Sequence, residues 1–257
     1  MQGWDILLLM ARLAAEAGDE TETLRLVAAA GNIASHYHDV ESSSLYGETV
    51  VILMDLDLNG IAFKLLLPAL GRNADLARWK AVLWKRDLTP TDFASVMRGE
   101  WNADASFLTL PILLRMAKNH ELPDSEAVAR IYTAWFNSCV TRLPSFRLAD
   151  MADALNLPAD ISLLSKEGRD VIKSLSIGLS SWTRGYVTAA TRQAQSRAAL
   201  DLLILEKSGA SLTTAAAGQV TRDPVSGSPF VLDPAARTLV APPSSVASSI
   251  EPLALPW

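Results

Sequence analysis

The chain has 257 residues, of which 49% are hydrophobic and 20% are charged, and its net charge is −5. This composition excludes a disordered chain and is enough for one large core or two modest ones. The acidic balance and the scattered basic residues give no support for nucleic-acid binding. The single cysteine, Cys139, excludes an internal disulfide, which fits a cytosolic protein and equally a periplasmic one without bridges.

We expect no transmembrane helix, because no apolar run of about 18 residues is free of charges. The nearest candidate, Ser42 to Gly71, carries Glu48, Asp55, Asp57 and Lys64. The first residues are apolar but have no basic leader and no small-residue cleavage site, so they predict a helix and not a signal peptide. Because this helix opens almost at Met1, the sequence also fits a piece of a longer protein with a separate leader or anchor.

The first two predicted helices form a hairpin. Trp4 to Ala17 is amphipathic, with one apolar face made of Leu7, Met10, Ala11 and Ala14. Gly18-Asp19 breaks this helix, and a second helix runs from about Thr21 to His38. Small residues at the expected contact resemble one tetratricopeptide-type hairpin, although no second copy follows at that repeat's period.

The segment from Ser42 to Gly71 predicts the central helix. Apolar residues lie on more than one of its sides, so we expect neighbours to cover it on more than one side. Ser42 to Ser44 provide a cap, Gly47 and Gly60 would allow another backbone to approach closely, and Pro68 should bend or end the helix.

Further helices follow in chain order. Their start signals are Asn73 as a cap, Thr89-Pro90 with Thr89 or Thr91 as the cap, and Asp124-Ser125-Glu126. Ser165-Lys166-Glu167 opens a long helical segment that reaches Lys207, and the glycines within it leave its straightness open. The predicted fold class is therefore all-α, an irregular helical bundle.

The pattern changes after Gly209. Asp223-Pro224 and Asp233-Pro234 both suit a type I turn, and two short strand candidates flank the second turn, Pro229 to Leu232 and Thr238 to Ala241. We therefore expect a helical domain at 1–208, a loop and β-hairpin appendage at 209–241, and a Pro/Ser-rich tail at 242–257.

The order of these parts resembles that of planctomycete-type bacterial envelope proteins. The matching pieces are Gly18-Asp19, the Ser42 to Gly71 helix, Arg98-Gly99-Glu100, Thr183 to Lys207, and the DPVSGSPF run from Asp223 to Phe230. That run corresponds to the DPFTGKPL-type segment of the family. It is also similar to the end of type II secretion pseudopilins, where an Asp-Pro-aromatic-Gly-x-Pro run leads into a short hairpin. The chain departs from both, because Val225 replaces the aromatic residue, no Tyr follows Phe230 and the usual His-Gly-x-Tyr-Pro segment is missing. The resemblance implies an envelope location and a role in an assembly, and it implies no activity.

Two patterns typical of metal sites have simpler interpretations. Asp55 to Gly60 matches the start of an EF-hand loop, but Leu66 stands where the bidentate Glu is needed, so polar residues inside a helix are the better interpretation. His36-Tyr37-His38-Asp39 places two histidines two residues apart, where a helix splays them, and a helix-end cluster is favoured. We predict no metal and no cofactor.

Glu48, Asp55 and Glu100 are the candidate catalytic acids. Carboxylates that converge inside a helical bundle perform acid–base chemistry or bind di-iron, but the Glu-x-x-His pairs of di-iron proteins are absent. Buried acids also require partners, so a structural role is the simpler alternative. The sequence contains no nucleophile elbow, P-loop or dinucleotide fingerprint.

Two functions of different class follow. The first is a non-catalytic helical scaffold or accessory subunit of a bacterial envelope assembly, with a cytoplasmic location not excluded. It would bind partner proteins through the C-terminal hairpin and tail, with candidate contacts at Asp223, Pro224, Gly227, Pro229, Phe230 and Trp257. The alternative is an envelope hydrolase that uses Glu48, Asp55 or Glu100.

Overall fold

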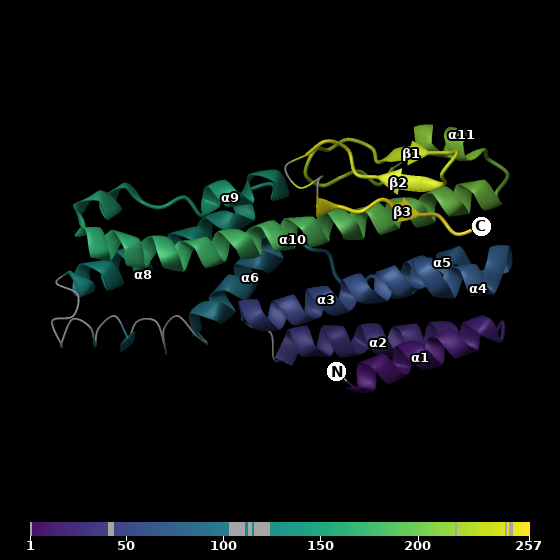
Figure 1. Ribbon diagram of the computed structural model, residues 1–257, viewed down its shortest axis with the longest axis horizontal. Helices are drawn as coiled ribbons and strands as arrows, with labels where there is room; N and C mark the ends of the chain where they lie inside the picture. The colour runs from purple at the N-terminus through teal and green to yellow at the C-terminus, as the bar shows by residue number, and fades with distance from the viewer. Residues whose placement is uncertain are drawn as a thin grey trace. The chain divides into compact units, whose positions relative to one another are not determined.

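The computed structural model describes residues 2–40, 44–102, 111–112, 115, 124–218, 220–244, 246 and 249–257. Most of these residues are helical, and a small antiparallel sheet lies near the C-terminus (Figure 1), which confirms the predicted fold class. The chain divides into two compact units. The first comprises Met1–Asp39, Val50–Asp87 and Thr188–Trp257, and the second comprises Val40–Thr49 and Leu88–Val187. Residues 209–257 therefore belong to the first unit and form no compact unit of their own.

The predicted N-terminal hairpin is confirmed as α1 (Gln2–Glu16) and α2 (Glu20–Val40). Gly18 adopts a φ of +76°, and Asp19 caps α2 by accepting a hydrogen bond from the Glu22 N–H at 2.9 Å. The buried face of α1 differs from the predicted one. Trp4, Leu8, Ala11 and Ala15 are buried, whereas Met10, which was predicted on the core face, is exposed.

The predicted central helix is α3 (Leu45–Ile61), and Ser44 caps it by accepting from the Gly47 N–H at 3.1 Å. The helix widens into a π-helical turn at Ala62–Leu66 and continues as α4 (Leu67–Leu70). Pro68 explains this turn, because proline has no N–H and its ring clashes with the carbonyl four residues earlier. The helix ends at Gly71, whose φ is +73°, so the predicted bend or end near Pro68 is confirmed.

The prediction that neighbours cover α3 on more than one side was wrong for one of its faces. The side with Val51 and Leu58 is buried, whereas Leu53 is 60% exposed and Leu65 of the π turn is 40% exposed. The predicted backbone approach at Gly60 was also wrong, because no atom lies within 4 Å of the place where a Cβ would stand.

The core of the first unit contains residues of α1, α2, α3 and α4. It also contains residues of α5 (Leu76–Leu83), the C-terminal part of α10 (Lys166–Lys207), α11 (Leu212–Ala217) and the sheet. The cap of α5 is Asp75 and not Asn73, since the Asp75 carboxylate accepts from the Arg78 N–H at 3.3 Å. Trp79 is fully buried, and its indole N–H donates to Glu20 at 3.1 Å.

The sheet has three strands in the order β1 (Val231–Asp233), β2 (Thr238–Val240) and β3 (Leu253–Ala254). The hairpin of β1 and β2, with Leu232 opposite Leu239, is the predicted one. The third strand comes from the segment that was expected to be a free tail, and it pairs Leu253 with Leu239. The tail therefore adds a third strand to the hairpin, beside β2.

The second unit contains α6 (Pro90–Glu100), α8 (Ser125–Arg142), α9 (Met151–Ala154) and the N-terminal part of α10. Of the two predicted caps of α6, Thr89 is the one that the structure shows, because its hydroxyl accepts from the Asp92 N–H at 3.1 Å. Asp124 precedes α8, but its carboxylate accepts hydrogen bonds from the backbone and hydroxyl of Ser165 at the start of α10. It thereby joins the beginnings of two helices.

Candidate partner-binding groove

Two rows of side chains on α3 and its π turn border an open groove in the first unit. One row, at four-residue spacing, is Leu53, Asp57, Ile61 and Leu65, and the other is Leu56, Gly60 and Lys64. Rows of this kind are the ridges by which helices pack into one another. Gly60 interrupts the second ridge because it has no side chain, and the cavity there has a volume of about 450 Å³.

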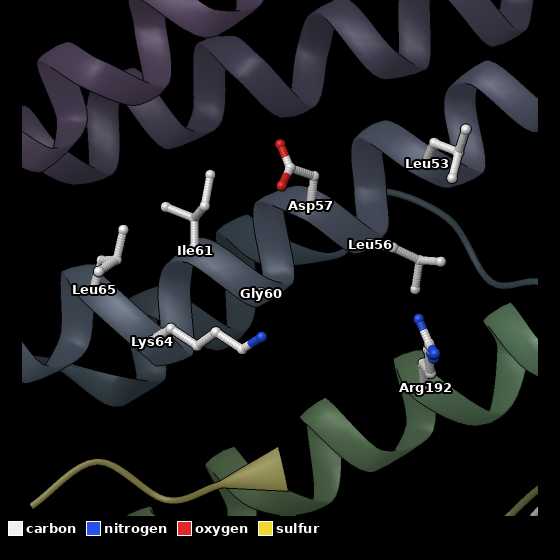
Figure 2. Close-up of a pocket in the computed structure, with 8 residues that line it drawn as sticks. All are labelled: Leu53, Leu56, Asp57, Gly60, Ile61, Lys64, Leu65 and Arg192. Carbon is white, nitrogen blue, oxygen red and sulfur yellow. The ribbon is translucent and has the colours of Figure 1, made fainter. Parts of the chain in front are cut away.

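Arg192 of α10 completes the groove on the side of the second ridge. Figure 2 shows Lys64 and Arg192 extending from the two helices into the same space, while Asp57 points away from it. The Arg192 guanidinium donates to the carbonyl of Ser249 at 3.0 Å. Among the described residues no carboxylate forms an ion pair with either cation. This side of the groove therefore presents positive charge beside apolar surface.

A smaller polar cavity of about 130 Å³ adjoins the groove, and Gly60, Lys64 and Arg192 line both. Asn59 lines the smaller one, and its side-chain N–H donates to the Asp55 carbonyl at 2.6 Å. Its carbonyl oxygen is buried and has no hydrogen-bond partner in the described part of the chain. A buried acceptor without a donor is costly, so this oxygen reduces the stability of the folded chain.

The C-terminal tail forms one wall of this polar cavity through Glu251, Pro252 and Leu253. Gln195 of α10 holds the wall in place. Its side-chain N–H₂ donates to the carbonyl of Leu239 at 2.7 Å and to that of Glu251 at 3.1 Å. The tail thus contributes to a concave surface, whereas the sequence predicted a free extension.

The predicted contact residues of the DPVSGSPF run have mixed positions. Asp223 is fully buried, and its two carboxylate oxygens accept from the N–H groups of Val225 and Ser226 at 3.2 and 2.9 Å. Thr191 of α10 also contacts it, at 3.4 Å. Phe230 is buried as well, Pro224 is half-buried, and Gly227 and Pro229 are exposed. A partner that binds this run would therefore contact its exposed residues, such as Gly227 and Pro229.

Trp257 is half-buried against the core of the first unit. It lines a cavity of about 50 Å³ together with Arg72, Leu76, Leu203, Glu206 and Lys207. The prediction of an exposed tryptophan on a free tail was therefore wrong. The tail follows the core because Ile250 and Leu255 are buried and β3 is paired.

The EF-hand-like pattern and the histidine pattern both lie inside helices, as we expected for polar residues of a helix and for a helix-end cluster. Residues 55–60 belong to α3, and His36 to Asp39 belong to the last turn of α2. His38 Nδ1 lies 3.2 Å from the Arg86 guanidinium. The described residues contain no group of three His, Cys, Asp or Glu side chains placed to hold a metal ion.

The three candidate catalytic acids are not all in the same unit. Glu48 and Glu100 belong to the second unit, and Asp55 belongs to the first. Glu100 accepts a hydrogen bond from the Leu45 N–H at 2.8 Å, so it caps the first turn of α3. Cys139 is buried, and burial raises the pKa of its thiol to about 11. Glu100 therefore has a structural role as a helix cap, and Cys139 has one as a buried core residue.

Sequence reasoning missed the groove because it treated every apolar residue of α3 as core. Asp57 and Lys64 do fall on one line of the helical wheel, and that polar line was the available signal for an exposed face. No sequence signal indicated that Arg192 borders this face, because it belongs to α10, which is far from α3 in the sequence.

Comparisons with known proteins add nothing to this geometry: no family model, no curated protein and no solved structure matches the chain. Within the described ranges, none of the helices has both the length and the apolar character that crossing a bilayer requires.

Proposed function

We propose that the protein is a non-catalytic helical scaffold or accessory subunit that binds a partner protein in the α3 groove. The observation that carries the proposal is the open apolar groove centred on Gly60, with Lys64 and Arg192 at one side. Exposed leucines that border a concave surface are typical of a protein-binding site.

The dimensions favour a helical segment as the occupant. The groove residues extend from Leu53 to Leu65, which corresponds to about 18 Å along the helix axis at 1.5 Å per residue. Roughly three turns of a second helix have the same length. The missing side chain at Gly60 leaves a hole into which one large apolar side chain of that helix would insert.

The charges favour an acidic segment. Lys64 and Arg192 extend into one space, and neither forms an ion pair with a carboxylate of the described residues. Arg also presents several N–H donors in a planar fork. An Asp or Glu on the partner helix would meet both cations. The occupant is therefore an amphipathic helix with an apolar stripe and acidic residues beside it.

A peptide-display selection tests this proposal. We expect peptides enriched on the wild-type chain to repeat apolar residues at i, i+3 or i+4, and i+7, with Asp or Glu between them. Gly60→Phe should reduce their affinity at least about tenfold, because the new ring fills the hole. Enriched peptides without this pattern, or peptides that bind Gly60→Phe equally well, would contradict the proposal.

Gly178→Phe provides the matched control. Gly178 lies in α10 within the second unit, it is exposed, and no atom lies within 4 Å of its Cβ position. The same substitution therefore adds a ring to an open helical surface outside the groove. Peptide affinity should stay at the wild-type value.

The envelope location implied by the DPVSGSPF resemblance forms part of this proposal. Fractionation of a bacterial host should recover the native protein with the envelope, and recovery with the cytoplasm would contradict the location without affecting the groove. The alternative of a hydrolase remains a prediction, and folded Glu48→Gln and Glu100→Gln variants that lose an activity would support it.

A further inference from the structure

The first helix exposes an apolar stripe that the groove does not use. Ile6, Leu9 and Leu13 are each 57% exposed and Met10 is 45% exposed. Their spacing of i, i+3, i+4 and i+7 places all four on one face of α1. The other face is already occupied, because Trp4, Leu8, Ala11 and Ala15 are buried in the core of the first unit.

This spacing is that of a helix–helix seam. In heptad terms Ile6 and Leu13 occupy a positions and Leu9 occupies the d position between them. Gln2 and Glu16, the next d positions, are polar, so the seam is about one heptad long. A short seam fits a weak association between two helices.

Two charges beside the stripe determine the orientation. Asp5 and Arg12 are exposed, stand seven residues apart and therefore lie on the same flank of the helix. Arg12 donates its Nε–H to Glu16 at 2.8 Å, which leaves the other N–H groups of the guanidinium available. In an antiparallel pair with the two-fold axis near Leu9, each Asp5 lies within about one residue rise, roughly 1.5 Å, of a position opposite Arg12. A parallel pair would instead place the flank of Asp5 and Arg12 beside the opposite flank of the partner helix, which carries Gly3 and Met10, and would gain no such contact.

We infer that α1 forms an antiparallel, two-fold symmetric interface with the α1 of a second copy of this chain. Each copy contributes the same stripe, and each Asp5 forms an ion pair with Arg12 of the other copy. The stripe offers less than the roughly 800 Å² per partner of a standard stable interface, so the dissociation constant should be on the order of 100 μM.

Sedimentation equilibrium of the full chain from about 10 μM to 1 mM tests the interface. The wild-type chain should pass from monomer to dimer over this range. Leu9→Glu should weaken the dimer at least about tenfold, because it places two carboxylates in the seam. Leu163→Glu, at an exposed leucine of the second unit, should leave dimerisation unchanged. Circular dichroism should show that both variants keep the wild-type helical content.

A charge-swap experiment tests the antiparallel orientation. Asp5→Arg alone and Arg12→Asp alone should each weaken self-association, because each then opposes like charges. An equimolar mixture of the two variants should recover dimerisation, since every pair across the interface is again of opposite sign. A wild-type chain that stays monomeric at 1 mM, or a mixture without recovery, would overturn the inference. Gly60→Phe should leave self-association intact, which separates this interface from the proposed groove.

Discussion

The guanidinium of Arg237 forms two hydrogen bonds with the carboxylate of Glu206, at 2.9 and 3.0 Å. Glu206 lies in the last turn of α10, and Arg237 is the last residue of the turn that joins β1 and β2. The backbone carbonyl of Arg237 also accepts from the Leu255 N–H at 2.8 Å. One residue therefore connects the long helix, the hairpin and the C-terminal tail.

Glu206→Gln should destabilise the chain at pH 7. The substitution replaces a two-point, charge-assisted contact between partly buried side chains with at most one neutral hydrogen bond. We expect a loss of about 1–2 kcal/mol in the free energy of unfolding. Urea denaturation measures it, and Glu22→Gln, which removes an exposed pair within α2, should cost much less.

The same pair should make stability depend on acidity. The hydrogen bond from Arg237 lowers the pKa of Glu206 below its ordinary value of 4.5. A carboxylate with a lowered folded pKa contributes stability above its unfolded pKa and loses that contribution as the pH falls through the folded value. The difference between wild type and Glu206→Gln should therefore be constant near neutral pH and shrink below about pH 4.5. A difference that stays constant down to pH 2 would contradict this origin.

Two glycines of α10 should respond in opposite ways to alanine. A Cβ at Gly168 would stand 2.7 Å from a carboxylate oxygen of Asp124, whereas a Cβ at Gly178 meets nothing within 4 Å. Gly168→Ala should cost about 1–3 kcal/mol, because the cap at the start of α10 must shift. Gly178→Ala should stabilise the chain by about 0.5–1 kcal/mol through helix propensity. Thermal unfolding of the two variants compares them directly, and equal effects would show that Asp124 does not occupy this position.

The thiol of Cys139 should resist alkylation in the folded chain. Its pKa of about 11, raised by burial, leaves little thiolate at pH 8.5. Iodoacetamide should react at least about 100-fold more slowly in buffer than in urea, as followed by mass spectrometry. Rapid labelling of the folded chain would show that the thiol is accessible.

Local signals predicted the elements of this fold well. Several turns and helix caps are formed by residues that are close in sequence, namely Gly18-Asp19, Thr89 and Asp233-Pro234. The local sequence is therefore sufficient to predict these turns and caps. Pro68 likewise accounts for the π-helical turn that follows α3, because its ring removes a hydrogen bond and clashes with the preceding turn. The all-α class with a C-terminal hairpin follows from such signals.

The faces of the helices could not be predicted in the same way. Met10 of α1 and Leu53 of α3 are apolar, yet both are exposed. Segments that are distant in the sequence determine which side of each helix is covered. The tail illustrates the same limit. Its proline and serine content resembles a linker, but the pairing of Leu253 with Leu239 and the contacts of Gln195 hold it against the core. The groove depends on the exposed face of α3, and the smaller cavity that adjoins it depends on the tail.

An NMR titration of the chain with the tightest acidic peptide from the display selection tests binding in the α3 groove. Binding in the groove predicts amide shift changes concentrated at residues 53–65, 192–196 and 251–253, and their loss in Gly60→Phe. Shift changes confined to other surfaces, or unchanged in Gly60→Phe, would show that the α3 groove is not the binding site.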